Sequence, residues 1–250
     1  MRWCLVVLLL GFFGSSVSMA AARGEGSDGP IRVMVITGGH DFDRDAFFGM
    51  WNRMEGITWK ETQHPSAFAL FKPENHADID VFVFYDSPTT ISDEAKADLV
   101  QLVRSGKPVL FMHHALCSYS DWSEFPQIIG SQYVRKAYSE GGVTYPPSEY
   151  KHDVNQKIRV SGKRHFITRG VSDFEIIDET YGKMRIFPGN KVLLESESPI
   201  ATPPVLWTRK YGKGEVVSFQ LGHDGKAFAH PAFRQLLLQS VEYAYRKGKR

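Results

Sequence analysis

Three short turns that contain histidine hold the residues of this sequence best suited to chemistry. Each follows an apolar run typical of a buried β-strand, at residues 31–37, 108–112 and 215–221. If these strands are parallel neighbours, the turns meet at the carboxyl edge of one sheet, where ligands of open α/β sheets bind. The turns read Gly38-Gly39-His40-Asp41, Met112-His113-His114-Ala115 and Leu221-Gly222-His223-Asp224.

Imidazole side chains in such turns suit two kinds of chemistry, general acid–base catalysis and metal binding. His113 follows a buried strand at a position where several α/β enzymes expose a nucleophile, and a histidine there suits a general base or a metal ligand. Adjacent strand residues point to opposite faces, which favours His113 over His114. His40, His113 and His223 together form a candidate ligand set for zinc, manganese, iron or nickel. The alternative is that each histidine only hydrogen-bonds its own turn.

Two carboxylates and one further histidine could complete such a site. Glu179 follows a predicted strand and is a candidate acid–base group or ligand, or simply an exposed strand-end carboxylate. Asp224 could hold one ring nitrogen of His223 and so select its tautomer, or form a local turn. His152, in the irregular middle of the chain, could cover the site, although a surface loop is an equal alternative.

Residues just after the His113 turn suggest contacts with a sugar. Tyr119 or Trp122 could offer an apolar platform to a sugar ring, with Asp121 bonding its hydroxyl groups, whereas Trp122 could equally belong to the core. A nucleophilic pair of Cys117 with His113 is conceivable, but a buried free cysteine is usually inert. The sequence contains neither a dinucleotide fingerprint nor a P-loop, so we expect no nucleotide cofactor.

The elements that must position these residues follow an α/β pattern. Strand-like and helical runs alternate up to residue 112, which predicts a mostly parallel central sheet flanked by helices. Residues 118–150 show weak periodicity and are expected to be an irregular loop region. Short strands at 158–160, 175–177 and 192–195 suggest antiparallel additions, and residues 204–208 and 215–221 form a hairpin pattern. A last helix is expected from Pro231 to about Arg246.

The composition suits one globular domain after an export signal. The 250 residues are 42% hydrophobic, and 30 Lys and Arg balance 28 Asp and Glu, so nucleic acid is an unexpected partner. Residues 1–20 read as a signal peptide and 21–30 as a flexible leader, leaving a single domain at 31–248. We therefore expect a periplasmic or extracellular protein that is not attached to the membrane after cleavage. The sequence leaves the oligomeric state open.

Several stretches together resemble the ThuA-like, or trehalose utilisation, family over residues 31–246. The stretches that show the resemblance are the strand and turn at 35–40, the strand and turn at 109–115 followed by Trp122, residues 165–170, the Asp178-Glu179-x-Tyr181 motif, and residues 204–214 followed by Leu221-Gly222-His223. The resemblance implies a flavodoxin-like fold, similar to class I glutamine amidotransferases. Those enzymes carry a cysteine at or next to the position of His113 here, so the resemblance does not extend to their thiol chemistry.

The resemblance also links the chain to carbohydrate breakdown, including the metabolism of 3-keto sugars. Our working hypothesis is an exported enzyme that hydrolyses a glycoside or 3-keto-glycoside or cleaves it by elimination, with His113 as base or ligand. The small carbohydrate would be its partner. The alternative is a non-catalytic carbohydrate-binding or scaffold protein on an amidotransferase-like fold, which would tolerate substitution of His40 and His223.

Overall fold

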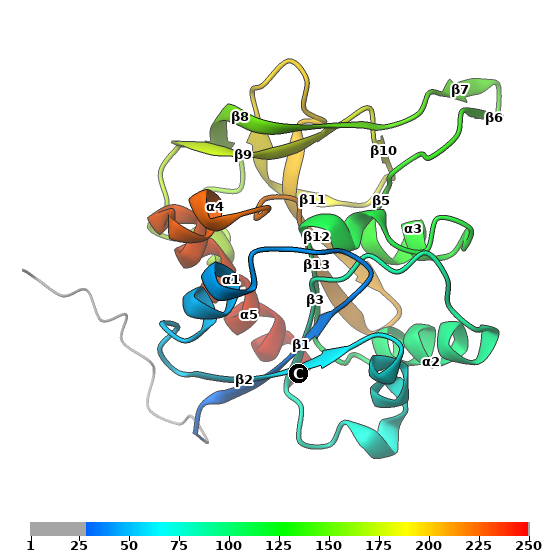
Figure 1. Ribbon diagram of the computed structural model, residues 1–250, viewed down its shortest axis with the longest axis vertical. Coiled ribbons are helices and arrows are strands. Elements are labelled where there is room, and N and C mark those ends of the chain that lie inside the picture. Colours follow the sequence, from blue (N-terminus) through cyan, green and yellow to red (C-terminus); the bar gives the residue numbers. More distant parts are fainter. Residues whose placement is uncertain (1–28, 250) are drawn as a thin grey trace, which may run out of the picture.

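A nine-stranded mixed sheet with helices on both faces forms the centre of the molecule (Figure 1). The computed structural model describes residues 29–249, so the predicted signal peptide and most of the predicted leader lie outside the described residues. The strands follow the order β2-β1-β3-β4-β13-β12-β11-β8-β9. No helix within residues 29–249 combines the length and the apolar character needed to span a membrane.

One half of the sheet is parallel. Its strands β3 and β4 are buried at every residue, Val-Phe-Val-Phe and Val-Leu-Phe-Met, as expected for parallel strands covered on both faces. Because all five strands of this half point the same way, their carboxyl ends share one edge. The five are β1 (Ile31–Thr37), β2 (Ile57–Gln63), β3 (Val81–Phe84), β4 (Val109–Met112) and β13 (Gly214–Phe219).

The other half is antiparallel, and its strands come from the second half of the sequence. The predicted hairpin is present, with β12 (Pro204–Tyr211) paired to β13. Next follow β11 (Lys191–Ser196), β8 (Glu149–Val160) and β9 (Phe174–Gly182). The structure thus confirms the predicted α/β fold class, in which the first strands of the chain form a parallel sheet and antiparallel strands are added in the second half.

Helices cover both faces of the sheet and enclose two apolar clusters. On one face lie α1 (Arg44–Trp51), α4 (Gly225–Ala229) and α5 (Pro231–Gly248), with Phe47, Phe228 and Phe233 in their cluster. On the other lie α2 (Asp93–Arg104), α3 (Phe125–Ile129) and the 3₁₀ turn η1 (Ser66–Phe71). The hydroxyl of Ser92 caps α2 by accepting from the backbone N–H of Ala95, as its position predicts.

The middle of the chain is more ordered than its sequence predicts. Residues 118–150 contain α3 and the short strands β5 (Ser131–Gln132), β6 (Tyr138–Glu140) and β7 (Val143–Tyr145), while β10 (Arg185–Ile186) pairs with β5. The strand expected at 158–160 is the end of β8, which begins at Glu149. The first residues of β8 are polar and exposed, so no apolar alternation marks them. Their pairing with β9 makes them a strand.

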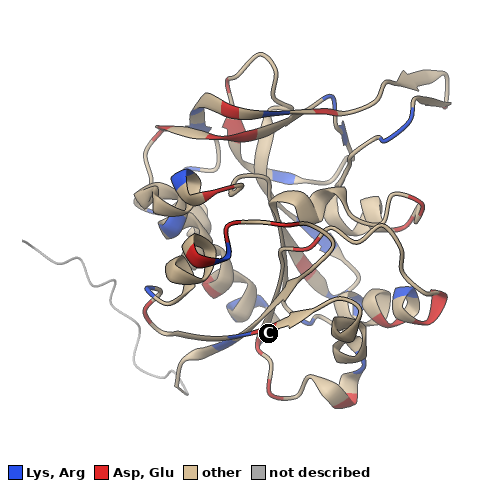
Figure 2. Cartoon of the chain, in the orientation of Figure 1, with Lys and Arg blue, Asp and Glu red and all other residues tan. Residues whose placement is uncertain are grey.

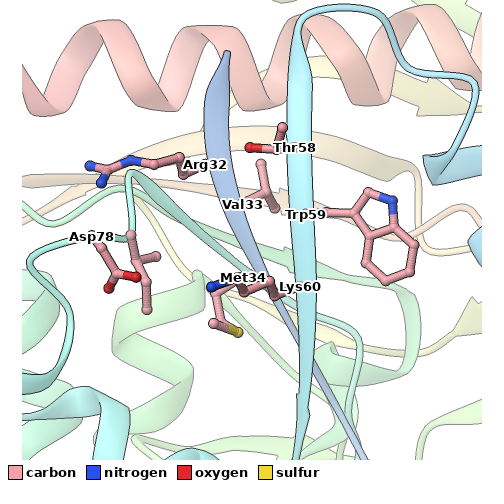
Figure 3. A pocket seen from close by; sticks show the side chains of 8 residues that line it. Arg32, Val33, Met34, Thr58, Trp59, Lys60 and Asp78 are labelled. Atoms are coloured by element: carbon pink, nitrogen blue, oxygen red, sulfur yellow. The ribbon is translucent and has the colours of Figure 1, made fainter. Parts of the chain in front are cut away.

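Charged side chains of both signs are interspersed over the elements (Figure 2). A cavity of about 200 Å³ lies beside the first half of β1 and of β2, lined in part by Met34, Trp59 and Asp78 (Figure 3). The histidine turns follow the opposite, carboxyl ends of the parallel strands. This cavity is therefore separate from the candidate site described next.

Candidate metal centre at the carboxyl edge of the sheet

The three histidine turns follow parallel strands, as the sequence predicts: His40 follows β1, His113 follows β4 and His223 follows β13. At the crevice between β1 and β3, where ligands of such sheets often bind, the chain packs closely on itself at Gly39. A Cβ atom placed on Gly39 would lie 2.6 Å from the backbone of Ser87, so the turn packs directly on the end of β3. The donor atoms converge further along the edge, at the ends of β4 and β13.

Side chains of His113, Glu179 and His223 converge at that place. One ligand atom of each lies within 4.8 Å of the others. The His113 Nε2 atom is 3.0 Å from His223 Nδ1 and 3.6 Å from Glu179 Oε1, while His223 Nδ1 is 3.5 Å from Glu179 Oε2. Ligand atoms at bond lengths of about 2.0–2.2 Å around a tetrahedral ion lie about 3.3 Å apart. These spacings, which involve both carboxylate oxygens of Glu179, are close to those that ligands of a small divalent cation have.

The tautomer of His113 also suits a ligand. Its Nδ1 lies 2.8 Å from the carbonyl oxygen of Gln220, and because a carbonyl can only accept, Nδ1 carries the hydrogen. The lone pair is then on Nε2, which faces Glu179 and His223. Burial, and next the neighbouring His114 ring, lower the pKa of His113 well below its usual value. The imidazole is therefore neutral, as metal binding requires.

The backbone turns sharply at His113 to present this ring. His113 has φ of +51°, a left-handed conformation that is uncommon for residues other than glycine. It opens the 3₁₀ turn η3 (His113–Cys117) directly after β4. Such strain concentrates where a strand-to-helix turn must expose a functional side chain. His113 thus stands at the predicted strand-end turn, but its side chain is fully buried rather than exposed to solvent.

Strand β9 brings the carboxylate to the two histidines. It crosses the end of β13, where Tyr181 N donates to the Gln220 side chain (Figure 1). Glu179 is 6% exposed, and its Oε2 atom lies 2.8 Å from Nδ1 of the half-exposed His152. The hydroxyl of Tyr181 lies 3.2 Å from His113 Nε2. A buried carboxylate is thus held among polar partners.

Asp178, next to Glu179, is a site residue that sequence reasoning missed. Its buried carboxylate accepts hydrogen bonds from the backbone N–H groups of Gly222, at 2.6 Å, and His223, at 2.9 Å. Burial raises the pKa of Asp178 to about 7, although these N–H groups oppose the shift. The sequence signal that could have identified Asp178 is its position next to the candidate residue Glu179. Asp178 anchors the turn that carries His223.

Two of the predicted site residues have other partners in the structure. The Asp224 carboxylate caps α4, accepting from the backbone N–H of Lys226 at 2.8 Å, and Asp178 rather than Asp224 holds the His223 turn. The His40 ring stacks on His114, with centroids 4.6 Å apart, outside the group of three ligand atoms. The converging set therefore contains Glu179 in the place that the sequence analysis gave to His40.

The predicted sugar contacts are dispersed. Trp122 packs on Tyr119 and Phe125 and is 9% exposed, which leaves little ring surface for a sugar. Tyr119 is buried beside His64, while Asp121 is exposed. Contact of any of the three with a sugar stays a prediction.

His152 reaches the site through an irregularity in β8. The pairing of β8 with β9 shifts register between Lys151 and Val154, and Asp153 has φ of +55°. In this bulge the His152 ring lies over His223, with centroids 4.7 Å apart. An ion pair between Asp153 and Lys226 ties the bulge to α4. His152 thus covers the solvent side of the converging residues, as proposed from the sequence.

Cys117 does not have the properties of a nucleophile. It is partly buried, and burial raises the pKa of its thiol to about 12. Because the thiolate is the reactive form, the thiol is unreactive at neutral pH. The elbow position itself belongs to His113.

Comparisons with known proteins agree with the fold and the sequence pattern. Among solved structures, a ThuA-like protein from Parabacteroides merdae superposes with a TM-score of 0.71 at 18% identity, covering 86% of this chain and 90% of the other. A ThuA-like protein from Bacteroides uniformis gives 0.63 at 14% identity, with 89% and 95% covered. A GMP synthase component from Thermoplasma acidophilum gives 0.54 at 9% identity, with 86% and 94% covered.

These identities are low, so the superpositions show a shared fold and nothing more specific. No curated protein matches the sequence. The ThuA family model, described as trehalose utilisation, matches residues 32–244, which is nearly the whole described part of the chain. The chain therefore belongs to the ThuA family.

Proposed function

We propose that this protein is an exported carbohydrate-active enzyme that binds a divalent cation through His113, Glu179 and His223. The observation that carries the proposal is the triangle of donor atoms, each within 4.8 Å of the others. Two imidazoles and one carboxylate form a donor set that suits catalytic zinc and non-haem iron, and manganese or nickel are further candidates. Three protein ligands leave a position for substrate or water.

The substrate we propose is a glycoside, in particular one oxidised to a ketone at C3. The ketone acidifies the neighbouring C2–H bond. In an elimination, a base takes this proton, the electron pair forms a C1=C2 double bond, and the glycosidic oxygen leaves C1 with a proton. In a hydrolysis, water replaces the glycosidic oxygen at C1. A bound cation would polarise a substrate oxygen and stabilise negative charge on it.

The residues of this chain have distinct roles in the proposal. His113 contributes an unprotonated Nε2, because its hydrogen lies on Nδ1, which donates to the carbonyl oxygen of Gln220. Asp178 holds the turn of His223, and His152 contacts Glu179 from the solvent side. We assign to His152 the contact with the sugar, since its half-exposed ring lies where a substrate would enter. The sequence pattern proposes that His152 covers the site, and the present proposal adds a contact between its ring and the sugar.

The test combines metal analysis with turnover. The purified protein is loaded with zinc, manganese, iron or nickel and incubated with trehalose or with trehalose oxidised at C3, while released glucose is measured. We expect release from the oxidised sugar only in the presence of metal. Absorbance of the conjugated enone distinguishes elimination from hydrolysis. Release that persists unchanged after chelation of all metal would contradict the proposal.

A matched pair of variants separates the metal site from general effects on β9. Glu179→Gln removes the ligand charge and should abolish stoichiometric metal binding and turnover. Glu175→Gln alters an exposed residue of the same strand, whose carboxylate lies 3.9 Å from Lys157 Nζ. This variant should change neither metal binding nor turnover. Binding of sugar without metal and without release would favour the alternative, a carbohydrate-binding protein.

A further inference from the structure

Three neighbouring histidines have their tautomers selected by backbone carbonyl groups. The Nδ1 of His113 faces the Gln220 oxygen, Nε2 of His114 lies 3.3 Å from the Tyr85 oxygen, and Nδ1 of His40 contacts the oxygen of its neighbour Asp41. A carbonyl accepts and cannot donate, so each of these nitrogens carries the hydrogen. Each ring therefore keeps a lone pair on its other nitrogen. For His113 this lone pair faces the metal centre.

The lone pair of His114 has no partner. The side chain is buried, with 4% of the residue exposed, and within residues 29–249 no group hydrogen-bonds to its Nδ1. Buried acceptors without a donor are uncommon in folded proteins and call for an explanation. Since its hydrogen lies on Nε2, toward the Tyr85 carbonyl oxygen, the ring keeps Nδ1 as an acceptor. A neutral acceptor of this kind suits an O–H donor.

The exposed ring of His40 covers His114. The two rings stack at 4.6 Å, while Tyr85 lies on His114 at 4.2 Å. The hydrogen bond found for the His40 ring is local, to Asp41. Rotation about the side-chain bonds of His40 would open space on this face of His114 without movement of the tightly packed Gly39 backbone. His40 would then offer its own Nε2 lone pair beside the His114 ring.

We propose that His114 and His40 form a subsite that accepts hydrogen bonds from hydroxyl groups of a pyranose ring. The His114 ring centroid lies 5.4 Å from that of His113, so a sugar held here would adjoin the metal centre. This inference rests on the proposed function and specifies how its substrate is held. It also gives the two histidines that do not ligate the metal a role in recognition.

Two substitutions at His114 separate hydrogen bonding from packing. In His114→Gln, the side-chain amide nitrogen can still donate to Tyr85 O, but no acceptor remains at the position of Nδ1. In His114→Asn, the side-chain oxygen retains that acceptor, while the contact with Tyr85 O is lost. The proposal predicts that the dissociation constant for glucose rises about tenfold in His114→Gln, the size expected for one hydrogen bond, and much less in His114→Asn. A purely structural role predicts the opposite order.

The probes are D-glucose and its 2-, 3-, 4- and 6-deoxy analogues, titrated into the zinc-loaded protein. We expect one analogue to bind the unaltered protein about tenfold more weakly than glucose, and to lose that difference in His114→Gln. The ¹⁵N resonance of His114 Nδ1 should move upfield when glucose is added, as it does when a lone pair accepts a hydrogen bond.

Three outcomes would overturn the inference. The first is an Nδ1 resonance that does not move at saturating glucose. The second is an equal ratio of the dissociation constants for the deoxy analogue and glucose in the unaltered protein and in His114→Gln. The third is a greater loss of glucose affinity in His114→Asn than in His114→Gln. If metal loading and turnover are normal in the same samples, only the subsite is rejected and the proposed function stands. If the protein takes up neither metal nor sugar, both proposals are rejected.

Discussion

The Nδ1 atom of His113 lies 2.8 Å from the carbonyl oxygen of Gln220, and this contact joins the ends of the neighbouring strands β4 and β13. It orients a ring whose backbone is already in a left-handed conformation. Local strain and a long-range hydrogen bond together aim His113 Nε2 at Glu179 and His223.

The first prediction concerns Asp178, which accepts from the N–H groups of Gly222 and His223. Substitution Asp178→Ala leaves these groups without their acceptor, so the His223 turn should lose its position. We expect metal affinity to fall about 10- to 100-fold, as for other residues that orient a ligand. Zinc titration measures the change. Asp224→Ala is the control for α4, and an equal loss of zinc affinity there would count against the role of Asp178.

The second prediction concerns the fit of Gly39 against Ser87. Gly39→Ala places a Cβ 2.6 Å from the Ser87 backbone and also requires φ of +81°. Gly141 has φ of +59° and open space around it. Gly141→Ala therefore carries the cost of a left-handed backbone conformation but brings no steric clash. We expect a loss of about 1 kcal/mol at Gly141 and at least about 2–3 kcal/mol at Gly39 in urea unfolding. Equal losses would show that the close packing of the turn is unimportant.

The third prediction concerns the thiol of Cys117. Its pKa of about 12, raised by burial, leaves very little thiolate at pH 8. Iodoacetamide should therefore label Cys117 slowly in the folded protein and rapidly in urea, which mass spectrometry can follow. Cys117→Ser should retain metal binding. Loss of turnover in parallel with rapid labelling of the folded protein would restore Cys117 as a candidate nucleophile.

The fourth prediction concerns pH and the ion pair of Asp80 with Arg32. Partial burial alone would raise the pKa of Asp80, but hydrogen bonds from the Arg32 side chain and backbone outweigh this effect, and the pKa lies below the usual 3.8. A carboxylate with a lowered pKa stabilises the fold above the pKa of the unfolded chain, and this stabilisation is lost as the pH falls through the folded value.

Asp80→Asn should thus reduce the free energy of unfolding at pH 7 by about 1 kcal/mol or less, because Arg32 is half exposed. The difference from the unaltered protein should shrink below a pH of about 4 and vanish when Asp80 is protonated in both states. Urea unfolding at pH 7, 5 and 3 measures it. A difference that grows on acidification would show that the pair does not hold the carboxylate in its charged form.

The sequence by itself determined the parallel half of the sheet and the strand-end positions of His40, His113 and His223. Short buried strands, helix caps and glycine turns are local signals, and parallel neighbours must share a carboxyl edge. Only the tertiary structure decided which groups meet there. Glu179 and His152 come from β9 and β8, whose polar residues show no periodic signal, and those strands reach the site by crossing the end of β13.

The same limit explains why Glu179 rather than His40 completes the converging set. The choice depends on side-chain directions at strand ends, and hence on φ of His113, the bulge at Asp153 and the stacking of His40 on His114. Such features arise from packing between residues that are far apart in the chain. Residue types and their spacing therefore located an edge rich in imidazole, whereas contacts between distant segments selected the three donor atoms.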